Sequence, residues 1–214
     1  MTRYVIWDFN GTLLDDLDAA VASVTDMLAR RGRPPMTRRR YYKLIDVPIS
    51  RYYEKLFDLS ETPMSVLIPE FQAGYEKHFS LARLGDGAQD ALDGFRAAGV
   101  RQVVLSSFRQ ARVEDILFRF GLTGYFDRIM GADDDFCAEK ATRGLQWLRE
   151  TGADPQDVLV VGDLVHDFEV ARAMDARCAL VSCGHQGVRD LLATGAPVYP
   201  DLRTMYETER ENLS

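Results

Sequence analysis

Four side chains that can do chemistry stand where an apolar run ends or a helix begins. Asp8, Ser106 and Asp163 each follow an apolar run, and Lys140 stands at the entry of a predicted helix. Carboxylates are oxygen ligands of the kind that Mg²⁺ prefers, whereas a hydroxyl and an ammonium can bind the oxygens of an anion. These residue types therefore favour a site where a divalent cation meets an anionic substrate.

The apolar runs predict buried strands of a parallel sheet. Val5–Trp7 stops at Asp8 and turns on Gly11, and Val158–Val161 stops at a Gly-Asp pair in the same way. Ligand sites in such sheets lie at the carboxyl ends of the strands, so we expect the candidate side chains to meet at one edge. Other strands are predicted at Val103–Leu105 (ending at Ser106-Ser107), Ile129–Met130, Cys178–Ser182 and near Val198.

Residues 16–84 carry no strand signal. An apolar stripe beginning at Leu17 predicts a long helix with Asp15-Asp16 as its cap. Further helix starts are predicted at Thr37, Pro48 and Thr62-Pro63, and Pro69 implies a kink or a break in the last helix. We therefore expect an α/β fold, with a Rossmann-like parallel sheet flanked by helices (residues 1–15 and 85–214) and an all-helical domain (residues 16–84) inserted after the first strand.

The composition limits the partners. The chain has 214 residues, a net charge of −7 and 46% hydrophobic residues, and its isoelectric point is near 5. This acidity argues against nucleic acid or an anionic membrane, because phosphate groups are bound by basic surfaces. No apolar run is long enough to span a bilayer, and we expect no signal peptide, because the residues from Met1 run directly into the first predicted strand. Cys137, Cys178 and Cys183 lack paired metal-ligand spacing, which is typical of reduced thiols in a cytoplasmic protein.

The first strand and its turn resemble a known motif. In the sequence Val-Ile-Trp-Asp-Phe-Asn-Gly-Thr, Asp8 and the Gly11-Thr12 pair match the first motif of the haloacid dehalogenase (HAD) superfamily. Ser106, Lys140 and the Asp163/Asp167 pair follow in the order and on the elements of the other three motifs. The resemblance covers essentially the whole chain, and residues 16–84 look like the helical cap of phosphoglycolate phosphatase-like members.

The resemblance implies a role for each motif residue. Asp8 would be the nucleophile that forms an aspartyl-phosphate, and Lys140 would neutralise Asp8 and the transferred phosphate. Ser106 would hydrogen-bond the phosphoryl group, with Ser107 as the adjacent alternative. The turn residues Gly11 and Thr12 would also contact the substrate.

The metal expected from the resemblance is Mg²⁺. Its protein ligands would be the carboxylates of Asp8 and Asp163 and the backbone carbonyl of Asn10, which does not depend on the side chain at that position. Asp167 belongs to the same acidic set, where it would hold a metal-bound water or Lys140 rather than the metal itself.

Position 10 departs from the motif. Phosphatases of the superfamily carry a second aspartate there, which protonates the leaving group and later deprotonates water, and the amide of Asn10 can do neither. Two alternatives remain open: a substrate whose leaving group needs no proton, or a substitute acid, for which His166 is the nearest candidate in the sequence. His78 and His185 have less to recommend them as catalysts.

The predicted function is a Mg²⁺-dependent phosphohydrolase that acts on a small phosphorylated metabolite as a monomer or small homo-oligomer. Other HAD chemistry is an alternative, either halide cleavage or phosphonate cleavage through Lys43, Lys55 or Lys77. A phosphate-binding or regulatory protein with impaired turnover is another. A receiver-type signalling domain fits poorly, because such domains have no helical insertion after their first strand.

Two charged features remain outside the motifs. The helical cap should close over the site and carry substrate recognition, and Lys43 and Arg51, which flank the Asp46-Val47-Pro48 break, are the expected contacts to an anionic substrate. The acidic run Asp133-Asp134-Asp135 and the basic run Arg38-Arg39-Arg40 are interpreted as solvated surface.

Overall fold

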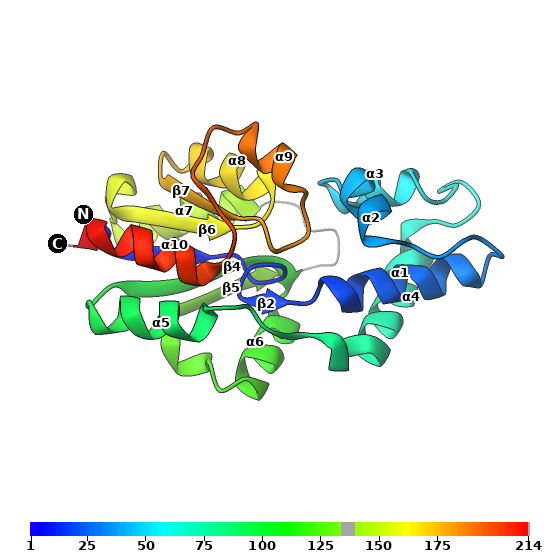
Figure 1. Cartoon of the computed structure of the whole chain (residues 1–214), viewed down its shortest axis with the longest axis horizontal. Coiled ribbons are helices and arrows are strands. Elements are labelled where there is room, and N and C mark those ends of the chain that lie inside the picture. The colour runs from blue at the N-terminus through cyan, green and yellow to red at the C-terminus, as the bar shows by residue number, and fades with distance from the viewer. Residues whose placement is uncertain (134–139, 214) are drawn as a thin grey trace. The chain divides into compact units, whose positions relative to one another are not determined.

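A parallel sheet forms the centre of the larger of two compact units. The structure is a computed structural model that describes residues 1–133 and 140–213 (Figure 1). Within these residues the sheet has six strands in the order β5-β4-β1-β6-β7-β8, and every neighbouring pair is parallel. This confirms the predicted α/β class. The strands are β1 Tyr4–Trp7, β4 Arg101–Arg109, β5 Arg128–Ala132, β6 Val158–Gly162, β7 Arg177–Val181 and β8 Val198–Tyr199.

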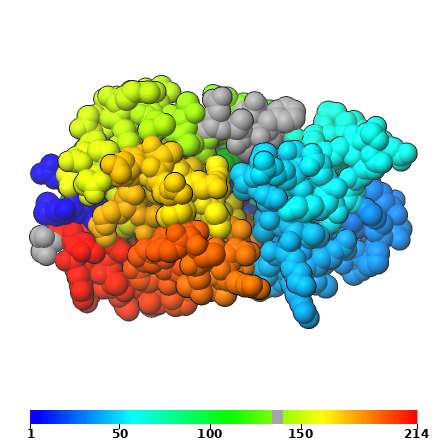
Figure 2. Space-filling view, turned by 90° about the horizontal axis from the view of Figure 1, so that it is seen from above, coloured from blue at the N-terminus to red at the C-terminus, as the bar shows by residue number. Residues whose placement is uncertain are grey.

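The chain contacts define two units. The core unit comprises Met1–Leu14 and Leu84–Ser214, and the helical unit comprises Asp15–Arg83. The helices of the core unit are α5 Ala88–Ala97, α6 Gln110–Arg119, α7 Lys140–Thr151, α8 Val165–Ala173, α9 Val188–Leu192 and α10 Leu202–Glu209. Single 3₁₀ turns lie at Thr123–Tyr125, Pro155–Asp157 and Arg210–Leu213. In the space-filling view, α9 (orange) and α10 (red) lie on the exposed surface of this unit (Figure 2).

Successive side chains of β1 point to opposite faces of the sheet, and their contacts show which helices cover each face. Ile6 packs in one apolar cluster with Trp147 of α7 and Val170 of α8. The next residue, Trp7, points to the opposite face, where its ring lies edge-on to Phe95 of α5 with centroids 5.7 Å apart. The ring of Phe95 in turn contacts Tyr206 of α10. The central strand is therefore covered on both sides, which explains why its sequence is a continuous apolar run.

The helical unit has its own apolar core. Its helices are α1 Leu17–Ala29, α2 Arg38–Leu44, α3 Ile49–Glu54 and α4 Met64–His78, followed by a 3₁₀ turn at Phe79–Leu81. The core includes Leu28 of α1, Tyr41 of α2, Tyr52 of α3 and Leu67 of α4. Thr37 caps α2 as predicted, because its side chain accepts a hydrogen bond from Arg40 N.

Some local predictions were wrong. Leu14–Asp15 (β2) and Arg83–Leu84 (β3) pair as a second, two-stranded sheet, although no strand was predicted between residues 16 and 84. Strands of two residues are too short to show a periodicity. The β4 strand does not end at Ser106 but continues to Arg109 through a shift in its register with β5 between Leu105 and Arg109.

Two predictions about helix ends also need correction. Asp16 holds the N-cap position of α1, but its side chain makes no capping hydrogen bond and instead accepts one from Tyr75 Oη at 2.6 Å. Helix α4 continues through Pro69 without a break. It packs closely along α1, and a Cβ atom at Gly74 would lie 3.2 Å from the backbone of Ser23. This packing stabilises α4 despite the hydrogen bond that proline removes.

A buried amide links the central strand to helix α5. Gln102 is 1% exposed; its Oε1 accepts from Trp7 Nε1 at 3.0 Å, and its Nε2 donates to Leu92 O at 2.9 Å. We expect Gln102→Met to lower the free energy of unfolding by about 1–3 kcal/mol, because it leaves a buried donor and a buried acceptor unpaired. Urea denaturation measures this loss. Gln146→Met, at an exposed position of α7, is the matched control and should stay within about 0.5 kcal/mol of the wild type.

Candidate active site

Asp8 lies where the central strand of the sheet ends. Its backbone N–H donates to Val161 O of the neighbouring strand at 2.8 Å, which fixes the residue at the carboxyl edge. The residue is only 7% exposed. Burial is the largest influence on its carboxyl group and raises the pKa of Asp8 to about 6, against the opposing effect of the Lys140 charge. The predicted nucleophile is thus a buried carboxylate beside a cation.

Lys140 supplies that cation from the first residue of α7. Its Nζ atom lies 2.5 Å from Asp8 Oδ1 and 2.5 Å from Asp167 Oδ1, and the residue is 3% exposed. Burial alone would lower the pKa of Lys140, but the charges of Asp167 and Asp8 outweigh this effect and raise it. The ammonium therefore stays charged between two carboxylates.

Asp167 uses both of its carboxylate oxygens to organise its neighbours. Oδ1 accepts from Lys140, and Oδ2 accepts from the backbone N–H groups of Asp163 and Leu164 at 3.1 and 2.9 Å. Of the two roles expected for Asp167, the geometry thus favours holding Lys140. The same hydrogen bonds fix the backbone directly after β6, where Asp163 begins the loop.

Asp163 is fully buried, and donors of the protein hold both of its oxygens. Oδ1 accepts from Thr12 Oγ1 at 2.9 Å, and Oδ2 accepts from His185 N at 2.6 Å. Burial, the largest influence, raises the pKa of Asp163 to about 8. The carboxylate is oriented by these two donors, but neither of them carries a full positive charge.

The turn after β1 brings Thr12 to Asp163. Gly11 N donates to Leu14 O at 2.8 Å and Leu14 N donates to Phe9 O at 2.9 Å, so the chain reverses tightly. Gly11 has φ +81°, and a Cβ atom there would collide with the Asp163 carboxylate and the His185 ring. Only glycine fits both constraints. Asn10 is half-buried in this turn and forms a bridge with Leu14.

Ser106 lies in the irregular part of β4 rather than at its end. The residue is 1% exposed, and its Oγ accepts from Phe108 N at 3.0 Å. Arg143 of α7 donates to the Ser106 carbonyl at 2.7 Å. The strand is irregular at Ser106, and the hydrogen bonds with Phe108 N and Arg143 hold the residue in place. Ser107 is half-buried, and the preference between the two serines stays a prediction.

The three aspartates can hold a metal ion. Oxygen atoms of Asp8, Asp163 and Asp167 lie within 4.8 Å of one another. When all three carboxylates are ionised, the buried cluster with Lys140 has a formal charge of −2. A divalent cation would neutralise this charge, and hard carboxylate oxygens suit Mg²⁺. Asp167 accepts three hydrogen bonds, whereas Asp163 accepts two and Asp8 is contacted by Lys140, so Asp8 and Asp163 have more capacity left for a cation.

Comparison with known proteins places the chain in a family. The sequence profile of the haloacid dehalogenase-like hydrolases matches residues 5–181. The chain belongs to this family. A phosphoglycolate phosphatase of Xylella fastidiosa is 30% identical over 193 residues, which cover 88% of this chain and 83% of that protein. An N-acetylmuramic acid 6-phosphate phosphatase of Pseudomonas aeruginosa is 28% identical, covering 86% and 83%.

Solved structures agree with the fold of this HAD-like hydrolase. The crystal structure of a predicted phosphatase from Clostridium acetobutylicum superposes with a TM-score of 0.83 at 22% identity, and it covers 99% of both chains. In the part of the chain that the structure describes, no helix is long and apolar enough to cross a membrane.

Other residues singled out in the sequence lie elsewhere. The His166 ring lies beside Glu169 on α8, with Nδ1 3.3 Å from Glu169 Oε2, and its role as a substitute acid stays a prediction. Asp133 is exposed, as expected for a solvated loop. Asp134, Asp135 and Cys137 fall outside the described residues.

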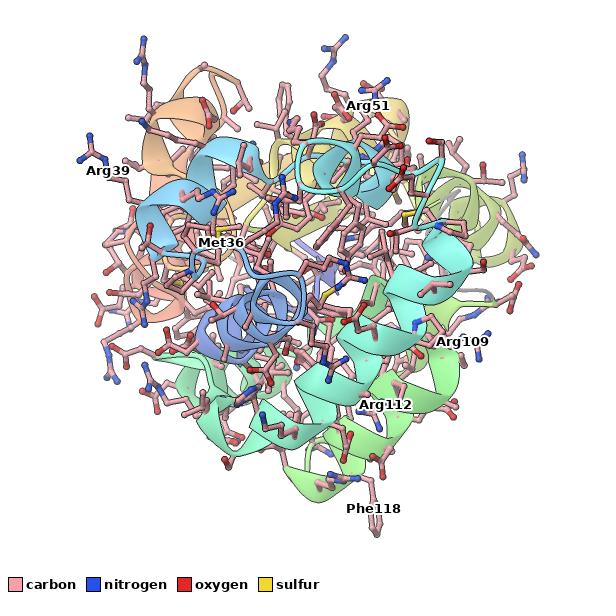
Figure 3. The ribbon with its side chains drawn as sticks, turned by 90° about the vertical axis from the view of Figure 1, so that its right-hand side faces the viewer. Met36, Arg39, Arg51, Arg109, Arg112 and Phe118 are labelled. Atoms are coloured by element: carbon pink, nitrogen blue, oxygen red, sulfur yellow. The ribbon has the colours of Figure 1, made fainter. Side chains whose placement is uncertain are left out.

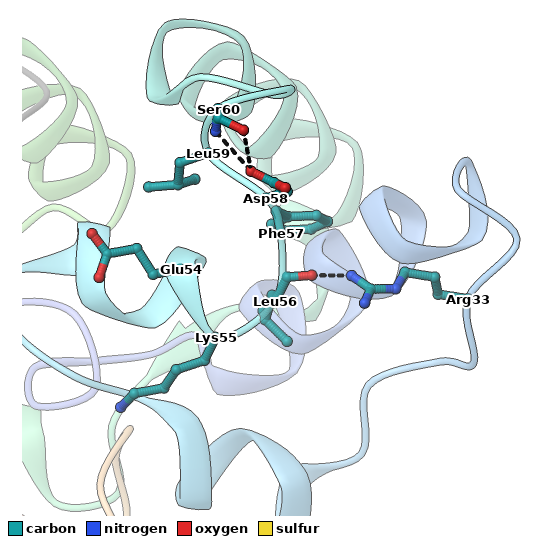
Figure 4. A pocket seen from close by; sticks show the side chains of 8 residues that line it. All are labelled: Arg33, Glu54, Lys55, Leu56, Phe57, Asp58, Leu59 and Ser60. Carbon is teal, nitrogen blue, oxygen red and sulfur yellow. Dashed lines mark hydrogen bonds between the residues drawn. The ribbon is translucent and has the colours of Figure 1, made fainter.

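Lys43 and Arg51 are exposed residues of the helical unit, and the side chain of Arg51 extends outward (Figure 3). A separate pocket of about 540 Å³ lies on this unit (Figure 4). Its lining consists of Arg33, Glu54, Lys55, Leu56, Phe57, Asp58, Leu59 and Ser60. Arg33 donates to Leu56 O and Lys55 pairs with Asp46 at 2.7 Å, so both cations are already engaged.

His185 contributes its backbone to the site, which was not predicted, whereas its catalytic role stays untested. The residue is 8% exposed, its N–H holds Asp163, and its ring lies against Gly11. It follows β7, the neighbour of β6, and the strand predicted at Cys178–Ser182 ends just before it. Ligand sites lie at the carboxyl ends of parallel strands, so the end of the strand predicted at Cys178–Ser182 indicates this loop as part of the site.

The loop after β7 leads to a prediction about Gly184. A Cβ atom at Gly184 would collide with Asp163 Oδ2 and Gly11 O, although the backbone there does not require glycine. We expect Gly184→Ala to displace Asp163 and weaken Mg²⁺ binding about 10- to 100-fold, as measured by isothermal titration calorimetry.

Gly124→Ala is the matched control for this variant, because nothing lies within 4 Å of a Cβ atom there. Both variants should keep the circular dichroism spectrum of the wild type. Mg²⁺ binding by Gly184→Ala with wild-type affinity would contradict the role given to this loop.

Proposed function

We propose that the chain is a Mg²⁺-dependent phosphohydrolase that forms an aspartyl-phosphate on Asp8. The observation that carries this proposal is the buried cluster of Asp8, Asp163, Asp167 and Lys140, with its formal charge of −2. A carboxylate that attacks a phosphoryl group must overcome repulsion between like charges. The cluster supports this reaction because it pairs the nucleophile with an ammonium and leaves charge for a divalent cation.

The residues of the chain would divide the work of the first step. Asp8 attacks the phosphorus atom, and Lys140 neutralises charge on Asp8 and on the phosphoryl oxygens. Ser106 donates its hydroxyl to a phosphoryl oxygen, because its Oγ already accepts from Phe108 N and keeps its own proton free to donate. Asp167 holds Lys140 in place through the 2.5 Å contact.

Mg²⁺ would be held by Asp8 and Asp163, together with the backbone carbonyl of Asn10. When bound, the ion would screen the repulsion between Asp8 and the phosphoryl oxygens. Thr12 and the N–H of His185 orient Asp163 toward that role. In this proposal Asp163 binds the metal, whereas Asp167 binds Lys140.

The relatives support a phosphatase with a small substrate. Two of them are named as phosphatases for phosphoglycolate and for N-acetylmuramic acid 6-phosphate, which are chemically different metabolites. We infer the reaction class from them and leave the metabolite open. The compact unit Asp15–Arg83 supports the proposal of a helical cap, and the free cysteine Cys178 supports a cytoplasmic location.

The first test removes the nucleophile and a metal ligand separately. We expect Asp8→Asn to lower Mg²⁺-dependent phosphatase activity by about 10⁴-fold or more, because the covalent step is lost. Asp163→Ala should lose Mg²⁺ binding while the chain stays folded. Phosphate release from a panel of phosphorylated metabolites measures the activity, and calorimetry measures the binding.

Asp115→Asn on the surface of α6 is the control for these variants and should behave as the wild type. Full activity in EDTA would contradict the metal requirement. Halide release without a metal would indicate dehalogenase chemistry. Because Asn10 cannot activate water, a burst of phosphoenzyme with no later release would instead indicate a phosphate-binding or regulatory protein.

The second test uses pH. Burial raises the pKa of Asp163 from 3.8 to about 8, so between these values the metal-free folded chain holds a proton that the unfolded chain has lost. The contribution of Asp163 to the free energy of unfolding therefore falls as the pH rises through this window. Mg²⁺ competes with the same proton, and its affinity should rise from about pH 6 to about pH 8. A flat affinity over this range, measured by calorimetry, would contradict the assignment of Asp163.

A further inference from the structure

We propose that the substrates of this enzyme are phosphoryl compounds whose leaving group departs as a stable anion, namely acyl phosphates, aryl phosphates or phosphoanhydrides, rather than alkyl phosphates. This inference rests on the proposed function. The reason is that, among the described residues of the core unit, the groups argued to lie around Asp8 are poorly suited to protonate a leaving group.

The three carboxylates of the site are already engaged in other contacts. Asp167 accepts three hydrogen bonds, from Lys140 and from two backbone N–H groups, so both of its oxygens are engaged in holding its neighbours. Asp163 accepts from Thr12 and from the His185 backbone, and it is a proposed metal ligand. Asp8 itself forms the new bond to phosphorus. None of the three can serve as the general acid.

Lys140 is also a poor proton donor. Its ammonium lies 2.5 Å from each of two buried carboxylates, so a lost proton would leave both of them without their cation. An unpaired buried charge is strongly unfavourable. The remaining side chain on the turn beside Asp8 is the amide of Asn10, which exchanges no proton at neutral pH.

The core unit has two histidines, His166 and His185. The His166 ring is engaged by Glu169 on its own helix. The His185 ring packs against Gly11, next to Asn10, and it is the one candidate that an experiment must exclude.

The chemistry balances without a general acid. An oxygen of Asp8 attacks phosphorus, the bond from phosphorus to the leaving oxygen breaks, and the leaving group takes the electron pair as a carboxylate, phenolate or phosphate. Water then attacks phosphorus, the bond to Asp8 breaks, and both protons of the water leave on inorganic phosphate. An alkoxide is a far worse leaving group, since an alcohol is a much weaker acid than a phenol, with a pKa of about 10, or a carboxylic acid, with a pKa of about 4.

The test is a series of substrates with graded leaving groups. Rates of hydrolysis with Mg²⁺ are compared for acetyl phosphate, p-nitrophenyl phosphate, phenyl phosphate and alkyl phosphates such as phosphoglycolate. General acid catalysis is worth about 10²- to 10⁴-fold, so we expect kcat/KM to fall by at least that factor from the acyl to the alkyl compounds. Wild-type alkyl and acyl rates within tenfold of each other overturn the inference. A selective loss of the alkyl activity in His185→Asn would then assign the missing proton to His185.

A variant at position 10 gives a second measurement. Asn10→Asp restores a carboxyl group and should raise the rate with alkyl phosphates by up to about 10²- to 10⁴-fold, which narrows the gap between the alkyl and the acyl compounds. Gln146→Glu, the same type of change at an exposed position of α7, is the control. Because Asn-Gly sequences deamidate, peptide mass spectrometry across Asn10-Gly11 must confirm the amide in the wild type.

Failure of the proposed function looks different from failure of this inference. If no compound of the series is hydrolysed and Asp8 is not phosphorylated by acetyl phosphate, the phosphohydrolase itself is wrong. If all compounds are hydrolysed at similar rates, the phosphohydrolase stands and only the substrate class is wrong.

Discussion

The contact of one lysine with two buried aspartates is the interaction on which the site depends. Lys140 Nζ lies 2.5 Å from Asp8 and from Asp167, and all three residues are at most 7% exposed. Burial of a charge is unfavourable unless a partner of opposite sign is held in good geometry. The start of α7, the end of β1 and the start of α8 must therefore be placed together accurately, and the packing of α7 and α8 on the sheet provides this placement.

The need to pair buried charges also explains which hydrogen-bond donors contact Asp163. One ammonium cannot satisfy three carboxylates, and Asp163 is held instead by Thr12 Oγ1 and by His185 N. These donors orient the carboxylate without removing its charge. Burial raises the pKa of Asp163 to about 8, because the opposing electrostatic effect of His185 is smaller. A site that binds a divalent cation requires such residual charge, whereas a purely structural cluster would be unfavourable with it.

Two glycines make this crowding possible. Gly11 and Gly184 both approach the Asp163 carboxylate so closely that a Cβ atom would collide with it. The loops after β1 and β7 can therefore close on the residue that follows β6, which lies between them in the sheet order. The carboxyl edge of the sheet is formed here by backbone as much as by side chains, and this explains why residue types alone describe it incompletely.

The sequence by itself determined the class of the fold, because apolar runs of parallel strands and the helices between them are local patterns. It also placed Asp8, Asp163 and Lys140 at the ends of such elements, and these residues lie close together in the structure. The tertiary structure alone decided which partner each group has. The contact of Lys140 with Asp8 joins residues 132 positions apart, and that of Thr12 with Asp163 joins residues 151 apart. The continuation of β4 past Ser106 and the burial of His185 also depend on packing between distant segments, which no local pattern encodes.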